Sequence, residues 1–273
     1  MRENVTSNRL IVDLKNIGLE PGDTVMIHAS VKSIGWLVGG PGIILTAIQE
    51  VIGPEGTILM YVGWEDGPYT MERWSKEKKR TYFEECPPFD PRTSRATREW
   101  GILAETLRTW PGPKRSAHPD GSFCANGKNA GYLLARHAFK FGYGRNSPLA
   151  KLIELDGKVL LLGSPLSNVT LLHHSESMCK VENKPIVRYK APVLRAGKRV
   201  WVEVEEYDTS SGIFPDYQGD CFNDIVTAYL KTQSLGSSKI GMARSYIFDA
   251  RSLDEFGTRW LEDWAKRPRG DSE

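Results

Sequence analysis

Two short hydrophobic runs near the start of the chain predict buried β-strands. Residues 24–28 and 57–62 have almost no polar break, which is typical of strands covered on both faces. A hydrophobic segment over residues 42–51 predicts a helix between them, and Pro41 suits the first turn of that helix. Strand, helix and strand at this spacing form a βαβ unit and therefore predict a parallel sheet.

A third hydrophobic run, residues 159–162, predicts another buried strand, which Gly163 ends. Either Asn168 or Thr170 is expected to cap the helix that follows. This helix then begins above the end of a parallel strand. Open α/β sheets bind ligands at that edge, so the start of this helix is the first candidate site.

The rest of the chain predicts shorter elements and one antiparallel hairpin. Residues 186–194 and 198–204 alternate hydrophobic and polar positions around Gly197, which predicts the hairpin. The other expected elements are a helix over 5–17 capped by Thr6 or Ser7, a helix over 101–109, a strand over 123–126 with a helix to about 136, helices over 149–154 and 222–230, a strand within 240–248, and a helix over 252–265 capped by Ser252. We therefore predict the α/β class: a single domain over residues 1–273, with a mostly parallel central sheet flanked by helices.

Residues 63–99 interrupt this pattern with a long polar, charged and aromatic insertion. Insertions of this length after a strand end are usually functional or disordered. The aromatic residues of the insertion, among them Trp64 and Tyr69, predict partial order. We expect the insertion, and the hairpin with its acidic loop over residues 186–222, to shape a ligand site as lids rather than to form a second core.

Composition narrows the function classes. The chain has 273 residues, 40% of them hydrophobic, and a net charge of only +2, which gives no general sign of nucleic-acid or membrane binding. No hydrophobic run approaches the length of a membrane span, and the first residues lack the hydrophobic region of a signal peptide. The four cysteines show no zinc or redox spacing, so we expect reduced thiols, no metal and a cytoplasmic protein.

The small net charge hides a separation of acidic and basic residues. Residues 203–230 contain no lysine or arginine but seven acids, namely Glu203, Glu205, Glu206, Asp208, Asp216, Asp220 and Asp224. These acids either form an ordinary solvated face or create a field that attracts a polycation. Basic residues lie elsewhere, at Lys32 and at Lys114 with Arg115, where loop N–H groups can help to hold phosphate. Two ligands of opposite charge are therefore expected, although no nucleotide-binding glycine motif is present.

The helix after residue 168 carries candidate chemistry. His173 and Glu176 are three residues apart and so share one helical face. A neutral imidazole near a helix start, oriented by a carboxylate, is the minimum requirement for a general base. A histidine at such a position is also often only structural, and the residues by themselves leave both interpretations open.

Several stretches of the chain together resemble the aminoglycoside 3-N-acetyltransferases, the antibiotic N-acetyltransferase family. The matching stretches are IHASVKSIGWLVGG, GPEGTILMYVGWED, ECPPFDPRTS, RSAHPDGSF, NSPLAKL, KVLLLGSPLSNVTLLHHSE and EEYDTSSG. The insertion that ends in CPPFDP resembles the branch that modifies gentamicin-like drugs. The pyrophosphate motif of the separate GNAT acetyltransferases is absent, so a non-GNAT fold is expected.

The resemblance implies an enzyme that moves acetyl from acetyl-CoA to the 3-amino group of the 2-deoxystreptamine ring of aminoglycosides and so confers antibiotic resistance. The T-x-x-H-x-x-E motif of the family falls on Thr170, His173 and Glu176. His173 is then the general base, Glu176 orients it, and His174 is a supporting neighbour. Direct attack of the amine needs no covalent intermediate, but Cys124 near His118 keeps an acyl-cysteine route open.

The resemblance also implies two sets of binding residues. The coenzyme A side comprises His28, Ala29, Ser30, Val31, Lys32, Ser33, Arg115, Ser116, His118, Ser164, Leu166 and Thr170. The drug side comprises Trp64, Glu65, Asp66, Tyr69, Asp208, Asp216 and Asp220. Backbone N–H groups within 164–168 or 29–31 are candidates to receive the oxyanion that forms on the thioester.

Two other functions fit the same residues. A member of the same family can act on an amine that is not an aminoglycoside, and a non-catalytic protein can use the acidic segment to bind a polycation. The expected partners are an aminoglycoside and coenzyme A, with no nucleic acid and no membrane, and the expected assembly is a monomer or a homodimer.

Overall fold

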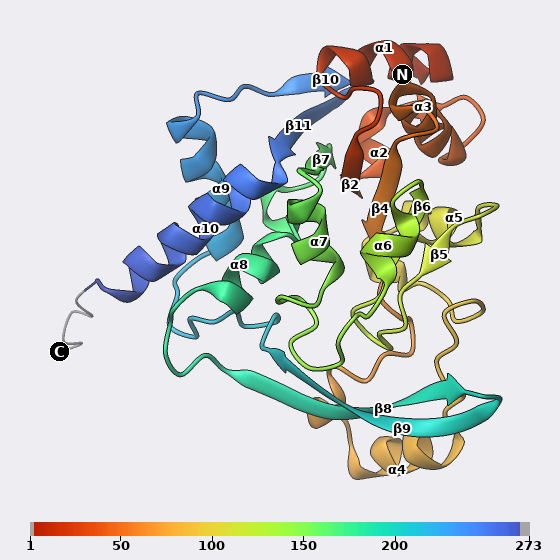
Figure 1. Cartoon of the computed structure of the whole chain (residues 1–273), viewed down its shortest axis with the longest axis vertical. Coiled ribbons are helices and arrows are strands. Elements are labelled where there is room, and N and C mark those ends of the chain that lie inside the picture. The colour runs from red at the N-terminus through yellow and green to blue at the C-terminus, as the bar shows by residue number, and fades with distance from the viewer. Residues whose placement is uncertain (1–2, 268–273) are drawn as a thin grey trace.

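The protein is built around one seven-stranded sheet (Figure 1). The structure is a computed structural model that describes residues 3–267, so the ends of the predicted domain, residues 1–2 and 268–273, lie outside it. In spatial order the strands are β10 (Ser238–Ile240), β11 (Ala243–Asp249), β7 (Lys158–Leu162), β2 (Thr24–Ala29), β4 (Thr57–Tyr61), β6 (Phe123–Gly127) and β5 (Lys114–Arg115).

The parallel pairing predicted from the sequence is confined to the centre of the sheet. β2 pairs in parallel with β7 on one side and with β4 on the other. The remaining pairings, β10 with β11, β11 with β7, β4 with β6 and β5 with β6, are antiparallel. The expectation of a mostly parallel sheet is therefore wrong for the two edges, because the hydrophobic runs give strand positions but not strand directions.

Helices cover both faces of the sheet and enclose two hydrophobic cores. One core includes side chains of α1 (Ser7–Asn16), α3 (Gly42–Ile52) and α5 (Ile102–Thr109). The other includes side chains of α6 (Ala130–Leu134), α7 (Pro148–Glu154), α8 (Leu172–Met178), α9 (Cys221–Thr232) and α10 (Ala250–Ala265). The central strands alternate between the two cores, since Val25 and Ile27 face the first and Met26 faces the second.

Helix caps follow the sequence signals only in part. The Thr6 side chain accepts a hydrogen bond from the Arg9 N–H and caps α1, as predicted. Asp249 rather than Ser252 caps α10, because Ser252 is the donor of that hydrogen bond. The predicted cap of α8 by Asn168 or Thr170 is wrong: a 3₁₀ turn over Leu166–Asn168 leads into α8, and no side chain caps that helix.

The predicted hairpin is formed by β8 (Ile186–Arg195) and β9 (Lys198–Tyr207). Ala196 and Gly197 join the strands with φ of 47° and 75°, the left-handed conformation that a tight two-residue turn requires. The hairpin runs along the lower edge of the molecule in Figure 1, with α4 (Lys76–Glu85) beneath it.

The insertion and the hairpin share a third hydrophobic cluster, which corrects the expectation that they are lids without a core. Trp64, Cys86 and Phe89 of the insertion pack with hairpin residues such as Tyr189 and Val204. Backbone hydrogen bonds also link the insertion to the hairpin: the Phe89 N–H donates to the Pro192 carbonyl at 2.8 Å, and the Leu194 N–H donates to the Phe89 carbonyl at 2.9 Å. We call this part of the molecule, residues 63–99 with β8 and β9, the lower unit.

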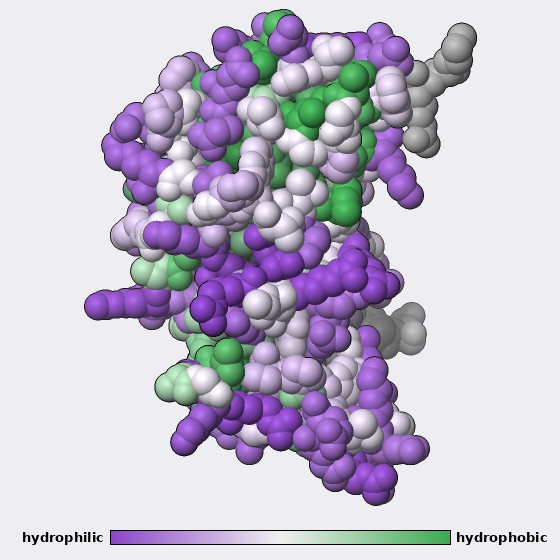
Figure 2. All heavy atoms as spheres, turned by 90° about the vertical axis from the view of Figure 1, so that its right-hand side faces the viewer, coloured by the Kyte–Doolittle hydropathy of each residue, from purple (hydrophilic) through white to green (hydrophobic). Residues whose placement is uncertain are grey.

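The two parts of the molecule differ in surface character on the face that Figure 2 shows. Figure 2 shows hydrophobic side chains at the surface mainly in the upper half of the molecule, with a mostly hydrophilic lower half. Two short 3₁₀ turns, over Met71–Arg73 and Arg98–Trp100, lie in and at the end of the insertion. The small elements β1 (Asn4–Val5), α2 (Val31–Ile34) and β3 (Trp36–Leu37) complete the fold.

The topology places a crevice at the carboxyl ends of β2 and β7. The chain leaves β2 toward β4 on one side and leaves β7 toward β11 on the other side. Loops that diverge from adjacent parallel strands in this way leave room for ligands between them. This is the region that carries the candidate site.

Candidate active site

A cleft of about 460 Å³ lies beside α8 and the segment that follows the hairpin. Among residues 3–267, its lining includes the acids Glu176 and Asp220 and no lysine or arginine, and we therefore call it the acidic cleft. The other lining residues are Trp100, Ser167, Asn168, Thr170, His173, Thr209, Ser210, Ser211, Gly212, Ile213, Phe214, Tyr217, Gly219, Cys221 and Phe222. Such a lining favours a cationic ligand.

A second cleft, of about 490 Å³, lies at the ends of β2 and β7. We call it the strand-end cleft, and its lining consists of Ile27, His28, Ala29, Ser30, Val31, Lys32, Met60, Tyr61, Glu99, Trp100, Gly101, Ile102, Ser164, Pro165, Asn168 and Thr170. Trp100, Asn168 and Thr170 line both clefts. Two ligands can therefore meet at these three residues, which we call the junction.

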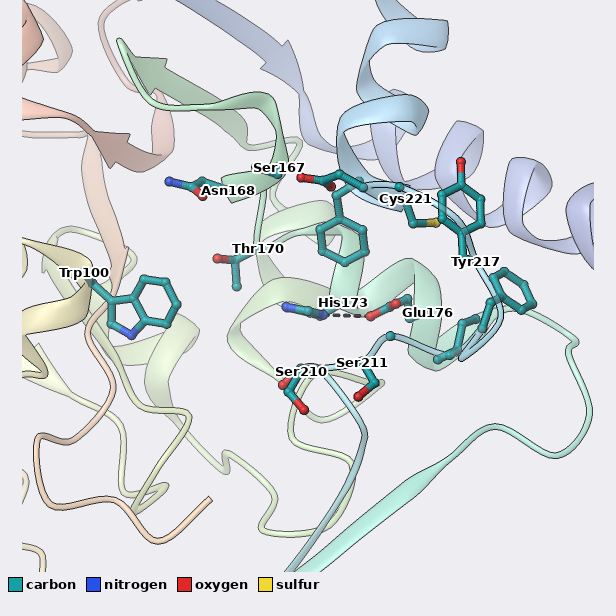
Figure 3. A pocket seen from close by; sticks show the side chains of 17 residues that line it. Trp100, Ser167, Asn168, Thr170, His173, Glu176, Ser210, Ser211, Tyr217 and Cys221 are labelled. Atoms are coloured by element: carbon teal, nitrogen blue, oxygen red, sulfur yellow. Dashed lines mark hydrogen bonds and ion pairs between the residues drawn. The ribbon is translucent and has the colours of Figure 1, made fainter. Parts of the chain in front are cut away.

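His173 and Glu176 form the pair that the sequence predicted. The His173 Nδ1 lies 2.7 Å from Glu176 Oε2, and both residues line the acidic cleft. The Glu176 side chain is only 4% exposed, whereas that of His173 is 20% exposed. In Figure 3 the other ring nitrogen of His173 points away from Glu176, toward the side of the cleft that Thr170 and Trp100 occupy. The pair thus presents one free imidazole nitrogen near the junction.

Two aromatic rings pack close to the His173 imidazole. Its ring centroid lies 5.2 Å from that of Tyr143 and 4.8 Å from that of Phe222. The carboxyl end of α8 is fixed as well, because the Lys184 ammonium donates to the backbone carbonyls of Glu176, Ser177 and Cys179 at 2.9 to 3.1 Å. The orientation of His173 is therefore determined before any ligand binds.

His174 points in another direction. Its Nδ1 lies 2.9 Å from Asp254 Oδ1, and the Ser175 hydroxyl donates to the same carboxylate at 2.7 Å. Both contacts attach α8 to α10. This placement fits the supporting role that we expected for His174.

Most of the residues expected to bind coenzyme A line the strand-end cleft. His28, Ala29, Ser30, Val31, Lys32, Ser164 and Thr170 all belong to its lining. Ser33 and Leu166 are not part of it: the Ser33 hydroxyl donates to the Ser30 carbonyl at 2.7 Å, and Leu166 packs against the second core. Lys32 and Glu99 are the charged side chains of this lining.

Arg115, Ser116 and His118 lie away from both clefts. The Arg115 guanidinium donates to the carbonyls of Gly63 and Ser94 and lies 4.8 Å from the Phe89 ring. It therefore holds the insertion against β5. Burial lowers the pKa of Arg115 to about 10.

The neighbours of Arg115 are also tied into the interior. The Ser116 hydroxyl accepts the Phe123 N–H and contacts His137 Nδ1 at 2.9 Å, and the His118 Nδ1 accepts the Gly121 N–H at 2.9 Å. Arg115 and Ser116 thus contact residues that are distant in the sequence, whereas His118 is held by its own loop.

The drug-side residues of the insertion have mainly structural contacts. Trp64 packs against Phe89 in the lower unit. Glu65 accepts the Arg98 N–H at 2.7 Å and forms an ion pair with its guanidinium. Asp66 accepts a hydrogen bond from the Tyr82 hydroxyl at its backbone carbonyl.

Tyr69 and Asp208 shape the acidic cleft without lining it. The Tyr69 hydroxyl donates to Asp208 Oδ1 at 2.9 Å and accepts the Thr209 N–H at 2.8 Å. The same Asp208 oxygen accepts hydrogen bonds from the N–H groups of Ser210 and Ser211. Residues 209–212, which do line the cleft, are therefore held in place by this contact.

The acidic segment is less uniform than its sequence suggests. Glu205 pairs with Arg188 at 3.2 Å and with Lys140 at 3.6 Å, and Glu203 lies 4.0 Å from Lys190, so these two acids belong to the solvated hairpin. Asp220 lines the acidic cleft and also caps α9. Asp216 lies in the loop before α9 and is not part of the lining of either cleft.

Sequence reasoning missed several residues at the clefts. Trp100 is 42% exposed and packs edge-on against Tyr61, where it forms a wall of both clefts. Asn168 is at the junction, and Cys221 and Phe222 line the acidic cleft. Trp100 directly follows the insertion, and nothing in the sequence separates it from packing aromatics such as Trp64.

The cysteine environments bear on the acyl-cysteine alternative. Burial raises the pKa of Cys124 to about 12 and that of Cys221 to about 12. Thiols of such high pKa contain almost no thiolate at neutral pH and are poor nucleophiles.

Residues 3–267 contain neither a cluster of metal-binding side chains nor a membrane-spanning helix. No group of three or more histidine, cysteine, aspartate or glutamate residues there is placed to hold a metal ion. In the same residues, no helix has both the length and the apolar character needed to cross a membrane. The cytoplasmic location and the state of assembly stay predictions.

Comparison with known proteins gives a consistent result. Residues 26–262 match the family model described as aminoglycoside 3-N-acetyltransferase. Aminoglycoside N(3)-acetyltransferase III of Pseudomonas aeruginosa is 44% identical over 257 residues, which cover 94% of this chain and 93% of the relative.

Solved structures agree with these sequence matches. AAC-IIIb in a binary complex with CoASH has a TM-score of 0.90 at 40% identity and covers 96% of this chain and 98% of its own. AAC-VIa bound to sisomicin has a TM-score of 0.91 at 35% identity and covers 97% of this chain and 100% of its own. The α/β fold class expected from the sequence is thereby confirmed.

Proposed function

The chain belongs to the aminoglycoside 3-N-acetyltransferase family, and on this basis we propose that it transfers acetyl from acetyl-CoA to the 3-amino group of the 2-deoxystreptamine ring of aminoglycosides, and so confers resistance. The observation that carries the proposal is the pair of adjoining clefts with the His173–Glu176 pair beside their junction. The relatives bound to CoASH and to sisomicin support one ligand of each kind.

The charged residues of the two clefts support placing one ligand in each cleft. The polycationic aminoglycoside occupies the acidic cleft, where Glu176 and Asp220 provide negative charge. Acetyl-CoA occupies the strand-end cleft, where Glu99 offsets the charge of Lys32 overall, but the Lys32 ammonium is available to pair with a phosphate. The acetyl group and the 3-amine then meet at the junction, which Trp100, Asn168 and Thr170 surround.

His173 is the general base. An aminoglycoside amine is mostly protonated at neutral pH and attacks a thioester only after it loses a proton. The free nitrogen of His173 takes this proton, while Glu176 accepts the Nδ1 hydrogen bond and keeps the ring in the orientation that exposes the other nitrogen. Proton transfer by a positioned group of this kind contributes about 10²- to 10⁴-fold to the rate.

Direct attack by the amine is preferred over an acyl-cysteine intermediate. Cys221 is the cysteine that lines the acidic cleft, and burial raises the pKa of its thiol. Cys124 is buried next to β5, away from the lining of both clefts.

The proposed unit of function is the single domain over residues 1–273. Residues 63–99 and 186–222 of this domain shape the drug site.

The assignment of His173 is tested by replacing it. His173→Ala is expected to lower kcat by about 100-fold or more, because the amine then loses its base, while aminoglycoside binding stays measurable. Thiol release from acetyl-CoA with gentamicin or tobramycin measures turnover, and calorimetric titration measures drug binding. Near-normal turnover of His173→Ala overturns the base assignment.

His174→Asn is the matched control. This neighbour lies on the same helix but contacts Asp254 instead of the cleft, and asparagine places an amide near the position of Nδ1. The variant is expected to keep turnover within about 10-fold of the parent.

The wild-type protein distinguishes the alternative functions. Thiol release only with simple metabolite amines points to a family member that acts on another amine. Drug binding without any thiol release points to a polycation-binding protein.

A further inference from the structure

His28 has an environment that coenzyme A binding by itself does not explain. It lies near the carboxyl end of β2, opposite Leu161 of β7, and lines the strand-end cleft together with Thr170. It also lies close enough to His173 for the two rings to interact electrostatically. His28 therefore stands on the cofactor side of the junction, while His173 stands on the drug side.

The His28 imidazole has a hydrogen-bonding atom that the protein leaves unused. Its Nε2 is buried, and no group within residues 3–267 makes a hydrogen bond to it. Burial lowers the pKa of His28 to about 4, with a smaller contribution from His173, so the ring is neutral at physiological pH and carries one N–H. A buried polar atom without a partner is costly, and because Nε2 is closed off from the cleft in this structure, an acyl oxygen reaches it only after the ring or the cleft wall moves slightly.

The reaction needs a donor at this place. When the amine attacks the thioester, negative charge develops on the carbonyl oxygen, and donors aimed at that oxygen accelerate the step. Several nearby candidates are already engaged: the Ser30 N–H donates to the Leu162 carbonyl, the Asn168 N–H to the Pro165 carbonyl, and the Thr170 N–H to the Asn168 carbonyl. The Tyr61 hydroxyl pairs with that of Tyr143 at 3.1 Å.

From this arrangement we infer that His28 is a further catalytic residue, whose neutral imidazole N–H donates a hydrogen bond to the thioester carbonyl oxygen as that oxygen becomes negative. The inference rests on the proposed acetyl transfer and assigns a function to a residue that the family resemblance placed only in coenzyme A binding. Within the part of the chain that the structure describes, no carboxylate hydrogen-bonds to His28, whereas Glu176 orients His173.

The two histidines then divide the reaction between them. The ammonium proton that His173 takes first passes on to solvent. The neutral amine nitrogen then forms a bond to the carbonyl carbon, a second proton passes from this nitrogen to His173, and the electron pair of the C=O bond moves to the oxygen that accepts the His28 hydrogen bond. The C=O bond then re-forms, the C–S bond breaks, and the sulfur of coenzyme A leaves with the bonding electrons and takes the proton from His173. The products are the N-acetylated drug and coenzyme A thiol.

Four variants test this role: His28→Ala, His28→Leu, His28→Gln and His28→Asn. Loss of an oxyanion donor typically costs about 10²- to 10³-fold in kcat, so we expect this loss for His28→Ala and His28→Leu, with the KM for acetyl-CoA within about 3-fold of the parent. Glutamine places an amide near Nε2 and asparagine places one near Nδ1. We expect one of these two to recover at least 10-fold in kcat, and this variant identifies the donating nitrogen.

A spectroscopic measurement separates hydrogen-bond donation from a structural role. Acetyl-CoA labelled with ¹³C at the carbonyl is bound to the wild-type protein and to His28→Leu, and the C=O stretch is recorded by difference infrared spectroscopy. Donation by His28 lowers the stretching frequency in the wild-type complex, and this shift disappears in His28→Leu. Thermal unfolding of each variant checks that the fold is retained.

The outcomes are distinct. An active wild-type enzyme whose His28→Leu variant keeps its kcat and its C=O frequency overturns the inference, and so does a variant that changes only the KM for acetyl-CoA. Equal losses in all four variants, with no frequency shift, also overturn it, since they indicate packing. A wild-type protein that never acetylates an aminoglycoside overturns the proposed function instead, whatever the His28 variants show.

Discussion

Burial gives some ionisable residues beside the active site unusual protonation behaviour. Glu206 lies at the end of β9, where its carboxylate accepts the N–H groups of Tyr143 and Tyr207 at 3.2 and 2.9 Å. Desolvation nevertheless dominates and raises the pKa of Glu206 to about 7. Asp120, which accepts the Tyr189 hydroxyl, has its pKa raised to about 6 for the same reason. These two acids help to hold the lower unit against the sheet body.

The raised pKa of Glu206 predicts a pH-dependent change in stability. Between about pH 4.5 and pH 7 the folded protein holds the Glu206 proton while the unfolded chain has released it, so this residue lowers the free energy of unfolding as the pH rises. Glu206→Gln removes the effect. The variant should therefore gain about 2–3 kcal/mol relative to the wild type between pH 5 and pH 8, since one pKa unit corresponds to about 1.4 kcal/mol.

Urea unfolding of both proteins at several pH values measures this gain. Glu205→Gln is a suitable control, because Glu205 is the adjacent acid but is solvated and paired with Arg188. A stability difference between Glu206→Gln and wild type that stays constant from pH 5 to pH 8 contradicts the prediction.

For single residues, the sequence predicts only those side-chain contacts that depend on local backbone geometry. His173 and Glu176 were found because three residues along a helix always bring two side chains together, and the contact does not depend on the rest of the fold. Arg115 is a contrasting case: its partners, Gly63 and Ser94, come from a distant segment that packs onto β5. Nothing near residue 115 in the sequence carries that information.

Between elements, the Tyr69 hydroxyl joins the insertion to the drug site. It binds both Asp208 and the backbone of Thr209, at the start of the segment over residues 209–212 that lines the acidic cleft. Tyr69→Phe leaves the Thr209 N–H without this partner and loosens the segment. We expect the KM for the aminoglycoside to rise by about 5- to 30-fold, equivalent to about 1–2 kcal/mol, with the KM for acetyl-CoA unchanged.

Steady-state kinetics with each substrate varied in turn provide the measurement. Tyr82→Phe is the matched control, since it removes a hydroxyl from the same insertion that donates to the Asp66 carbonyl and not to Asp208. Equal changes in the two KM values, or the same effect in Tyr82→Phe, would show that the contact between Tyr69 and Asp208 does not control the drug site.

Element types were easier to predict than their boundaries and directions. The hairpin was recognised because alternation and a Gly turn are local signals, and Ala196 and Gly197 do form the turn. The start of α8 is not predictable in this way, because a backbone 3₁₀ turn takes the place of the expected side-chain cap. The antiparallel pairing of β6 and β11 depends on how the chain returns to the sheet, and residues in the strands do not encode that path.

For the molecule as a whole, the main division is between the sheet body and the lower unit. The third hydrophobic cluster is separate from the two cores that cover the sheet. Phe89 is its central side chain, only 1% exposed and in contact with Trp64 and Arg115. Stability should therefore not be uniform, since the two parts rely on different side chains.

Phe89→Ala is predicted to weaken the lower unit selectively. The cavity costs about 3–5 kcal/mol locally, so amide hydrogen exchange should accelerate in residues 63–99 and in β8 and β9, while β2 and β7 keep their protection. Phe248→Ala is the control from the second core, because Phe248 is buried to a similar degree at 2% exposed. It should accelerate exchange in the sheet strands instead. Uniform acceleration in Phe89→Ala would show that the molecule unfolds as one unit.

The separate cluster of the lower unit also has an evolutionary consequence. Among the described residues, the third cluster shares no buried side chain with the two cores of the sheet body, so we expect changes in the insertion to be absorbed by its packing on the hairpin and not by the packing around the His173–Glu176 pair. Selection by a new antibiotic can therefore act on the part of the enzyme that supports the drug site, while the acetyl-transfer chemistry is inherited unchanged. A lineage built on this plan can diversify its drug range without first having to recover a working catalyst.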